Sequence, residues 1–564
     1  MIGHCDDSAI ESLSQQMALV EGLLRPRRRL FGCSSLARPL TASVLLLAPC
    51  LLFVAIHSPR VPIGAATAVA TTAHATWPER AYGVSLGGWL VMEINPSKRN
   101  ADSPIDLRPQ WMYDQFEGAS ELDFVTALRR QHGDDFAIQT MRNHWTHYYT
   151  DEMLDAALAL GVNTMRLPVG YWIVDAPVGG TSALEYGISP EGFVTGGLNH
   201  LKDMLIKLKK RNIGALVDVH AAPCNSACVS DGLYCASPLA FVTPGTNPIG
   251  DMKRCGLKGG VYPTSRVPQD GERTWDDVGR NSVEKLAKWL SALPTEAQSV
   301  VAFQLANEPA LGADAGMGKP PKEKEDAVNG FYAKLLPLVR AHLPSLPLVL
   351  SFIPPTDTVM AFLQKADEDD APMRTKGSKA MILADHHYYL NFQQPDVPPP
   401  QIEGERYDPM CCMTWPEIHR RACTARHNTG GIGWDVYVDA KQSIMIGEWS
   451  LAVNHDQWLD LSDAEVRKQL TILFKEQLEV FHATPKLEGS FYWALRMGSG
   501  WDPRPTDGYP EGRQLEDSSA WKSLETYPFQ VWSLLEMARL GIAQPLDGDY
   551  EGTCEEVLAA EAAP

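Results

Sequence analysis

The feature of this sequence that most restricts its fold is a repeated alternation of short apolar runs with longer amphipathic stretches. The apolar runs have the length and the Val, Ile and Leu content of strands buried on both faces, as in a parallel sheet. The stretches between them carry apolar residues at three- and four-residue spacing, which predicts helices. This alternation is typical of an α/β architecture. The strand-like runs lie at 82–86, 162–168, 213–219, 299–306, 346–352, 380–386, 443–447 and 488–495.

Eight such repeats predict a (β/α)8 TIM barrel with long insertions. A doubly wound open sheet is the alternative, but no Gly-x-Gly-x-x-Gly motif follows the first strand to support it. Two connections, 221–274 and 388–441, are much longer than usual and would build walls on the active face. The clearest helical stretches are 152–160, 200–211, 275–293, 326–342 and 463–481.

Two of the apolar runs end abruptly in a carboxylate. In 301–309 (VAFQLANEP) the apolar run gives way to Glu308, and in 443–450 (SIMIGEWS) it gives way to Glu448. A glutamate at the end of a buried strand is hard to solvate, and active residues of a barrel lie at the carboxyl ends of its strands. Glycoside hydrolysis needs two such groups, one to protonate the leaving oxygen and one to attack or to activate water. The competing interpretation is that each glutamate caps a helix or pairs with an arginine.

The other strand ends collect a similar set of polar and aromatic groups. Strand 2 supplies Arg166, His220 follows strand 3, and Asn307 precedes Glu308 after strand 4. A buried arginine is usually a partner for a carboxylate, and a lone histidine is usually a satisfied core residue. However, six separate strands end in groups of this kind, which purely structural roles would not predict. The remaining members are 385–389 (DHHYY) at the end of strand 6 and Trp493 near the end of strand 8.

The composition excludes some partners and permits others. The net charge of −19 argues against nucleic acid and against adhesion to anionic membrane surfaces. It is compatible with a neutral substrate such as a sugar. A hydrophobic content of 45% and a charged content of 21% are ordinary for a globular protein.

The cysteines favour disulfides over a zinc site. Eight of the eleven cysteines follow residue 200, and their spacing does not match the paired Cys-x2-Cys knuckles of zinc sites. Seven of these eight lie in the two long connections, which predicts stapled loops, with the pairing left open. The eight are Cys224, Cys228, Cys235, Cys255, Cys411, Cys412, Cys423 and Cys554.

The amino-terminal region predicts a membrane anchor ahead of the catalytic domain. An uncharged run at 40–56 follows a polar, arginine-rich tail, so the tail should stay cytosolic and the rest should be translocated. This indicates a type II, single-pass protein with an extracellular or lumenal catalytic domain. Secretion after cleavage near Ala75 is the alternative, because 73–75 fits the small-x-small pattern. The expected divisions are a tail at 1–39, an anchor at 40–57, a linker at 58–77, a barrel at 78–546 and an acidic, frayed tail at 547–564.

Seven ordered motifs resemble glycoside hydrolase family 5, and more narrowly its fungal exo-β-1,3-glucanase branch. Their order along the chain makes the set specific for the family, but less so for the substrate. They are 82–93 (YGVSLGGWLVME), 144–145 (HW), 165–172 (MRLPVGYW), 218–223 (DVHAAP), 307–309 (NEP), 447–450 (GEWS) and 491–493 (FYW).

The resemblance implies a retaining double displacement on a β-glucan. Glu448 would be the nucleophile, and Glu308 would be the acid that later acts as base, with their carboxyl groups about 5–5.5 Å apart. Arg166 would keep Glu448 ionised, and Tyr389 would donate to it. The expected contacts with the sugar are Asn307 at the 2-hydroxyl, His220, His387 and Glu93 around the −1 position, and Trp493 as a stacking floor.

Three departures from the branch leave the linkage and the exo action open. The glycine usual after the third-strand histidine is Ala221, the next segment is rich in cysteine, and the loop after strand 6 is enlarged. The aromatic gate at +1 is traceable only as Phe392 or Phe241.

Several alternatives therefore remain beside a glucan 1,3-β-glucosidase. A β-1,4- or β-1,6-glucanase, or a glycolipid glucosidase, would use the same residues. A non-catalytic glucan-binding protein is the alternative from another class, disfavoured because both glutamates and their supporting set are intact. A metal hydrolase using His386 and His387 is discounted, because adjacent strand residues point to opposite faces. No cofactor and no metal are expected.

Overall fold

The computed structural model describes the part of the chain that contains the barrel. The segments at 1–74, 93–120 and 223–274 lie outside it, so the anchor and linker predictions remain untested there. Among the described helices, none combines the length and the apolar character needed to cross a membrane. The described residues are 75–92, 121–222, 275–309, 322–352, 356–376, 381–393, 413–427, 433–453, 460–497, 501–502, 504–505, 510–511, 513–514, 530–555 and 559.

Eight parallel strands close into a barrel in the order β1 to β8, and β1 pairs with β8. Each observed strand overlaps its expected run, so the (β/α)8 prediction is confirmed and the open-sheet alternative is wrong. The strands are β1 (Ala81–Ser85), β2 (Thr164–Gly170), β3 (Gly214–Ala221), β4 (Val300–Gln304), β5 (Leu348–Ser351), β6 (Ile382–Tyr388), β7 (Ile444–Trp449) and β8 (Leu487–Tyr492). A separate pair is β9 (Trp501–Asp502) with β10 (Arg513–Gln514).

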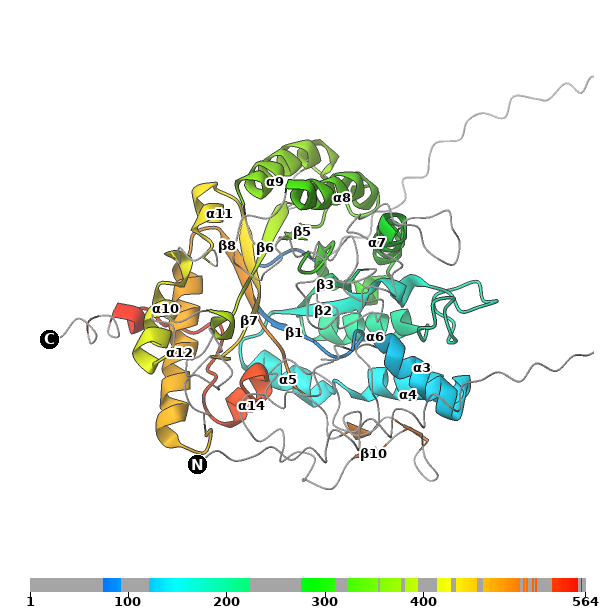
Figure 1. Cartoon of the computed structure of the whole chain (residues 1–564), viewed down its shortest axis with the longest axis horizontal. Helices are drawn as coiled ribbons and strands as arrows, with labels where there is room; N and C mark the ends of the chain where they lie inside the picture. The colour runs from blue at the N-terminus through cyan, green and yellow to red at the C-terminus, as the bar shows by residue number, and fades with distance from the viewer. Residues whose placement is uncertain are drawn as a thin grey trace, which may run out of the picture. The chain divides into compact units, whose positions relative to one another are not determined.

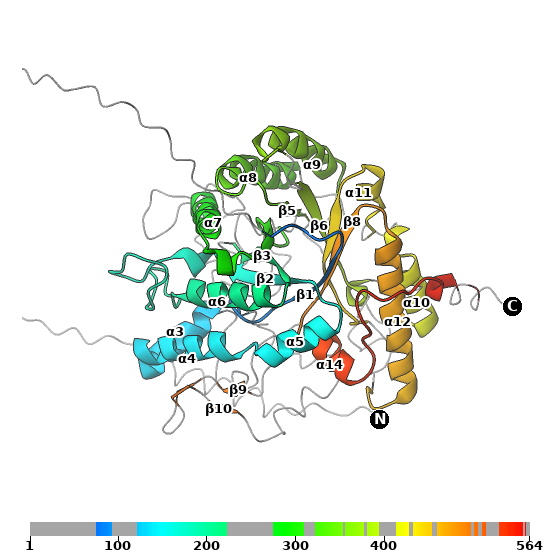
Figure 2. The same ribbon diagram turned by 180° about the vertical axis from the view of Figure 1, so that it is seen from behind.

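Helices surround these strands (Figures 1 and 2). The five helices expected from apolar spacing are all present as α5, α6, α7, α8 and α12. The described α-helices are α3 (Glu121–His132), α4 (Asp134–His147), α5 (Asp151–Ala159), α6 (Gly197–Lys210), α7 (Trp275–Ser291), α8 (Lys322–Arg340), α9 (Asp357–Asp370), α10 (Trp415–Cys423), α11 (Asp435–Asp439), α12 (Ala464–Ala483) and α14 (Leu534–Arg539).

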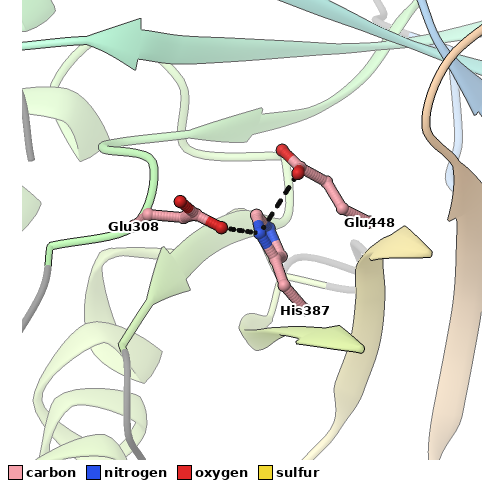
Figure 3. A group of neighbouring side chains, drawn as sticks. All are labelled: Glu308, His387 and Glu448. Carbon is pink, nitrogen blue, oxygen red and sulfur yellow. Dashed lines mark hydrogen bonds and ion pairs between the residues drawn. The ribbon is translucent and has the colours of Figure 1, made fainter. Parts of the chain in front are cut away.

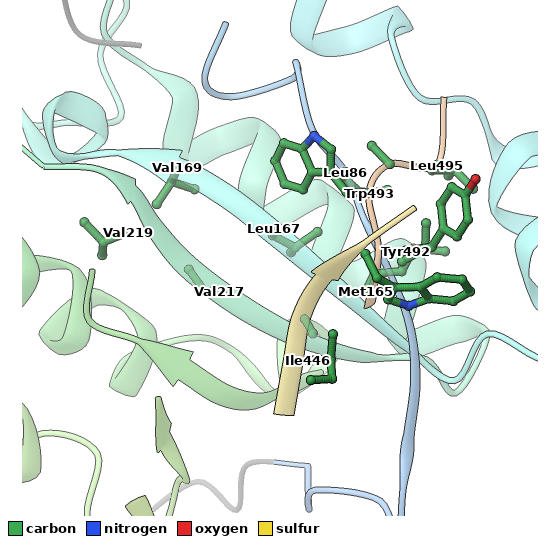
Figure 4. Packing of buried hydrophobic residues seen from close by; sticks show 14 of the residues in the cluster. Leu86, Met165, Leu167, Val169, Val217, Val219, Ile446, Tyr492, Trp493 and Leu495 are labelled. Carbon is green, nitrogen blue, oxygen red and sulfur yellow. The ribbon is translucent and has the colours of Figure 1, made fainter. Parts of the chain in front are cut away.

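The two faces of the strands differ in chemistry. On β2, Met165, Leu167 and Val169 belong to the large hydrophobic cluster that joins strands to helices (Figure 4). The alternate residue Arg166 is directed inward, because its partners come from β3, β4 and β7. This period of two is what a strand imposes on successive side chains. The outer face therefore supplies stability, and the inner face is left for polar groups.

The barrel interior is built in layers. The lower layer is an apolar cluster that includes Leu216 and Leu383 together with Trp77. Two residues further along the same strands, polar side chains replace apolar ones, as Asp218 does after Leu216 and Asp385 after Leu383. We call this second level the polar layer; it consists of Arg166, Asp218, Gln304, Ser351 and Asp385, all 0% exposed. The two glutamates lie beyond it along the strands.

The described residues 547–555 are attached to the barrel rather than frayed. Cys423 at the end of α10 forms a disulfide with Cys554, and their Cα atoms are 5.4 Å apart. The backbone N–H of Cys554 also donates to Glu479 Oε2 of α12 at 2.7 Å. The expectation of a frayed tail was wrong for these residues, because acidic composition could not reveal a covalent tie to a distant helix.

Candidate active site

Two carboxylates from different strands converge on one imidazole (Figure 3). Glu448 lies on β7, and Glu308 lies four residues beyond the end of β4. His387 Nδ1, on β6, is 2.5 Å from Glu308 Oε1 and 3.4 Å from Glu448 Oε2. One oxygen of each glutamate lies within 4.8 Å of the other. The two glutamates are 140 positions apart in the sequence. The barrel brings them together, because the carboxyl ends of its strands lie on one face.

Glu448 is bonded through both of its oxygens. Arg166 Nη1 donates to Oε1 at 2.7 Å, and the Tyr389 hydroxyl donates to Oε2 at 2.6 Å. Burial nevertheless raises the pKa of Glu448, and the charges of His387 and Arg166 oppose this increase only in part. Arg166 therefore lies where the resemblance placed it, but it does not by itself bring the pKa of Glu448 below the ordinary value.

Glu308 is more open than Glu448, with 29% of its side chain exposed. Burial would raise the pKa of Glu308, but the charge and hydrogen bond of His387 bring it below the ordinary value. For His387, burial alone would lower the pKa, yet the carboxylates of Glu448, Asp385 and Glu308 raise it well above 6.5. The lowered pKa of Glu308 and the raised pKa of His387 together place a proton on the imidazole, which lies between the two glutamates.

Glu308 also has an uncommon backbone conformation. Its φ of 42° is in the left-handed region, which costs a residue with a Cβ about 1–2 kcal/mol. The carboxylate of this same residue contacts His387 Nδ1. Strain of this kind persists only where surrounding contacts impose it, and it is concentrated at functional sites.

Three further expected residues lie around this centre. Asn307 Oδ1 accepts from Arg166 Nη2 at 2.6 Å. Trp493, just past β8, stacks on the His220 ring with centroids 5.2 Å apart and planes at 8°. The Arg166 guanidinium carbon lies 5.7 Å from the Trp493 ring centroid. These contacts join the aromatic floor to the charged centre.

The remaining expectations fall elsewhere. His386 packs its ring against Trp434 and Tyr437, away from His387, as alternation on a strand dictates. Glu93 and Phe241 lie outside the described residues, as does the side chain of Phe392. Their expected places in the sugar site and the +1 gate remain predictions.

No role was predicted from the sequence for the residues beneath the site, although Asp385 and Asp218 stand within the strand-end group and the motif named above. Gln304, Asp218 and Asp385 belong to the polar layer and are as buried as the apolar core. Asp218 Oδ2 lies 3.1 Å from Arg166 Nη2 and 2.8 Å from His220 Nδ1. The available signal was spacing, because Asp218 and Asp385 each precede an expected site histidine by two residues on the same strand face.

Glu308, His387 and Glu448 are also the kind of donors that bind a divalent metal. Most of their donor atoms, however, already have hydrogen-bond partners. Both oxygens of Glu448 accept hydrogen bonds, and His387 Nε2 faces Asp385 Oδ2 at 3.0 Å. The positive charge of Arg166 beside Glu448 further opposes a cation there. The arrangement suits proton transfer and nucleophilic attack better than metal binding.

Comparison with known proteins places this geometry in a family. Residues 130–479 match the family described as Cellulase (glycosyl hydrolase family 5). The probable glucan 1,3-beta-glucosidase A of Emericella nidulans is 33% identical over 158 residues, which are 28% of this chain and 32% of that protein. Glucan 1,3-beta-glucosidase 3 of Schizosaccharomyces pombe is 23% identical over 434 residues, which are 75% of this chain and 71% of that protein.

A solved structure, rutinosidase from Aspergillus niger, aligns with a TM-score of 0.48 and 13% identity, covering 75% of this chain and 92% of that one. The chain spans less than a third of the length of the first curated relatives it matches. The family match, in contrast, covers more than half of the 564 residues. The chain therefore belongs to the cellulase family, glycosyl hydrolase family 5.

Proposed function

We propose that the protein is a retaining β-glucan hydrolase, and specifically a glucan exo-1,3-β-glucosidase that releases glucose from β-1,3-glucan chain ends. Glu448 is the nucleophile and Glu308 the acid and base. Asn307, His220, His387 and Glu93 hold the −1 sugar, and Trp493 forms its stacking floor. Arg166 and Tyr389 orient Glu448. No cofactor is required for this chemistry.

The observation that carries the proposal is the spacing of the two glutamates. One oxygen of each lies within 4.8 Å of the other. Retaining glycosidases hold their carboxyl groups about 5–5.5 Å apart, whereas inverting enzymes need about 6.5–9.5 Å to admit a water molecule. The short spacing supports direct attack on the sugar over activation of a water.

The surroundings of each glutamate suit its proposed role. Glu448 is buried and held by two donors, so its attacking oxygen is fixed in direction, which lowers the cost of reaching the transition state. Glu308 is exposed enough to meet a leaving group and then a water. The acid limb of activity should lie above pH 4.5, because Glu448 must be ionised to attack and its pKa is raised.

The linkage preference rests on the relatives. Two fungal proteins that align with this chain carry the name glucan 1,3-beta-glucosidase, and one of them aligns over 75% of this chain. A β-1,4- or β-1,6-glucanase and a glycolipid glucosidase would use the same two glutamates. Product analysis distinguishes these substrates.

The test is hydrolysis by the full chain of linear β-1,3-glucan, β-1,6-glucan, cellulose oligomers and a simple aryl β-glucoside. Glucose alone from the β-1,3 substrate, abolished in Glu308→Ala and Glu448→Ala, is the expected result. Mixed oligomers, or activity on another linkage only, would keep the mechanism and change the substrate. If nothing is hydrolysed while Glu448→Gln binds glucan as the unmutated protein does, the chain is a glucan-binding protein.

We further propose that segment 40–57 anchors the protein in a bilayer with the barrel extracellular or lumenal. The arginine-rich flank of the uncharged run supports this orientation. The Cys423–Cys554 disulfide suits an oxidising compartment. Membrane fractionation with a carbonate wash should leave the intact chain in the pellet. Release of a fragment beginning near residue 76 would favour secretion instead.

A further inference from the structure

The polar layer contains an unbroken series of hydrogen bonds beneath the two glutamates. Arg166, which holds Glu448 through Nη1, also donates from Nε to Gln304 Oε1 at 3.0 Å. Gln304 Nε2 donates to Asp385 Oδ2 at 2.7 Å. The same Asp385 oxygen lies 3.0 Å from His387 Nε2. Neither the aspartate nor the glutamine has a role in the proposed chemistry so far.

The direction of each bond in this series follows from what its members can do. A guanidinium only donates, so Gln304 must turn its oxygen toward Arg166 and its N–H toward Asp385. An ionised carboxylate only accepts, so Asp385 requires a hydrogen on His387 Nε2. The ionised state of Asp385 is favoured, because burial raises its pKa but His387 and Arg166 together bring it below the ordinary value.

A hydrogen fixed on Nε2 determines what His387 Nδ1 can do. In the neutral ring, Nδ1 accepts the proton of a protonated Glu308. In the imidazolium, Nδ1 donates to the Glu308 carboxylate. Both forms contain the same single proton between the two groups, and the 2.5 Å contact suits either one. In the opposite tautomer the ring hydrogen lies on Nδ1 and Nε2 carries none. Nε2 would then present a lone pair to the Asp385 carboxylate, and passing the Nδ1 hydrogen to Glu308 would require an imidazolate.

We propose that Gln304 and Asp385 are positioning residues for the hydrolysis, which fix the Nε2-protonated form of His387 so that Glu308 and His387 jointly hold the proton given to the leaving group. This inference rests on the proposed function. In the first step the bond from the sugar C1 to the leaving oxygen breaks, a bond from C1 to Glu448 forms, and the shared proton passes through Glu308 to the leaving oxygen. In the second, water oxygen bonds to C1, the bond to Glu448 breaks, and one water proton returns to the pair.

Asp385 is the member of this series whose charge can be removed with little change of shape. The charge of Asp385 raises the pKa of His387, together with the charges of the glutamates. Asp385→Asn should therefore let the pair lose its proton at lower pH. Three carboxylates face His387: Glu308 beyond β4, Asp385 on β6 and Glu448 on β7. The further charged or titratable groups, which are bonded to these carboxylates or to their partners, are Arg166 on β2, Asp218 and His220 on β3, and Tyr389 beyond β6.

The experiment compares kcat/KM against pH for Asp385→Asn and the unmutated full chain on two aryl β-glucosides. One has a phenol leaving group, which needs a proton, and the other has 2,4-dinitrophenol, which leaves without one. The basic limb on the phenyl glucoside should move to lower pH by about one unit or more. At the pH optimum, kcat/KM should fall about 10²-fold or more for phenyl, and far less for dinitrophenyl.

Ser351→Ala is the matched control. Ser351 belongs to the same polar layer, is 0% exposed, and its Oγ has no hydrogen-bond partner among the described residues. Its pH profile and its ratio between the two substrates should equal those of the unmutated protein. A purely structural role for Asp385 would lower both activities equally and leave the basic limb in place, and that result would overturn the inference.

A second variant, Gln304→Met, keeps the inference testable if Asp385→Asn does not fold. Gln304→Met keeps every charge and removes the side-chain hydrogen bonds of Gln304 to Arg166, to Asp385 and, at 3.5 Å, to the Ala306 carbonyl. It should show the same selective loss on the phenyl substrate. If neither variant folds while Ser351→Ala does, the role is structural and the inference is wrong. An unmutated protein inactive on both glucosides and on every glucan would instead contradict the proposed function itself.

Discussion

Tyr389 shows how a single hydroxyl can matter to this site. Its ring packs against Trp532 with centroids 5.1 Å apart, and its hydroxyl donates to Glu448 Oε2 at 2.6 Å. Tyr389→Phe keeps the packing and removes a hydrogen bond to a charged group, which is worth about 1.5–3 kcal/mol. We expect kcat to fall about 10- to 100-fold with little change in Tm.

Steady-state kinetics on an aryl β-glucoside and thermal unfolding check this prediction. Tyr388→Phe is the matched control, because the Tyr388 hydroxyl donates to the Arg421 carbonyl at 3.2 Å on the outer side of β6. That variant should keep its kcat and lose some stability. Equal activity losses in the two variants would show that the hydroxyl of Tyr389 has no particular effect on Glu448.

The sequence was sufficient to predict the groups at the strand ends, and insufficient for those beneath them. Glu308, Glu448 and Arg166 follow apolar runs, so their types and positions stand out. Gln304 lies inside such a run, and its partners come from β2 and β6, which sequence spacing cannot bring together. The pKa directions were likewise out of reach, because they depend on the number of charges that share one buried space.

At the scale of an element, β7 can lie close to the Asp385 side chain only because residue 447 is a glycine. A Cβ built on Gly447 would lie 2.0 Å from Asp385 Oδ1 and 2.7 Å from its Cγ. Gly447→Ala must therefore displace the Asp385 carboxylate from Gln304 and His387. We expect a stability loss of about 1–3 kcal/mol from overpacking, together with a large fall in kcat/KM.

Gly330→Ala supplies the control for this prediction. Gly330 lies within α8, and a Cβ there would meet no atom within 4 Å. Alanine should raise stability by about 0.5–1 kcal/mol and leave kcat/KM unchanged. Thermal unfolding and kinetics on the two variants compare these effects. Full activity in Gly447→Ala would mean that Asp385 can move without consequence.

The first residue of α3 should make stability depend on pH. Glu121 is fully buried and accepts from the Met92 backbone N–H at 2.9 Å. Burial raises its pKa from 4.5 to about 8. The folded state thus keeps a proton that the unfolded state loses, so stability falls as pH rises from about 4.5 to about 8, by up to about 5 kcal/mol.

Glu121→Gln removes this dependence, because an amide retains an acceptor for Met92 and does not ionise. We expect the Tm of the variant to exceed that of the unmutated protein increasingly between pH 5 and pH 8. Differential scanning fluorimetry across this range is the measurement. Glu368→Gln, a change at an exposed position of α9, is the control, and its dependence of Tm on pH should equal that of the unmutated protein. A Tm difference between Glu121→Gln and the unmutated protein that stays constant from pH 5 to pH 8 would contradict the prediction.

More of the fold than of the site could be predicted from the sequence, because each strand and helix has its own local pattern of apolar residues. The runs for β1 to β8 were visible as uninterrupted apolar segments, since both faces of each strand are buried. The boundaries moved by a few residues where polar groups at strand ends still pair in the sheet, as for β6, which continues through His387 to Tyr388. Composition alone gave no sign that such polar residues extend a strand.

At the scale of the whole barrel, the end of the chain secures the strands that carry the site. The N–H of Ala494, just past β8, donates to the Trp532 carbonyl at 2.6 Å. Beyond α14, Cys554 returns to Cys423 on α10, closing a loop with a sequence separation of 131. Residues just after β8 therefore bond to the segment around Trp532, and Cys554 is fastened to α10 and α12.

Removing the Cys423–Cys554 disulfide should lower the thermal stability of the protein and leave its activity at low temperature nearly unchanged. A disulfide that closes a loop of this length contributes about 2–5 kcal/mol, mainly by restricting the unfolded chain. We expect Cys423→Ser with Cys554→Ser to reduce Tm by several degrees while kcat on an aryl β-glucoside at low temperature stays near the unmutated value, because neither sulfur contacts the polar layer. Reductant should lower the Tm of the unmutated protein more than that of the double variant. An unchanged Tm in the double variant would mean that the hydrogen bonds to Glu479 hold the segment without the covalent tie.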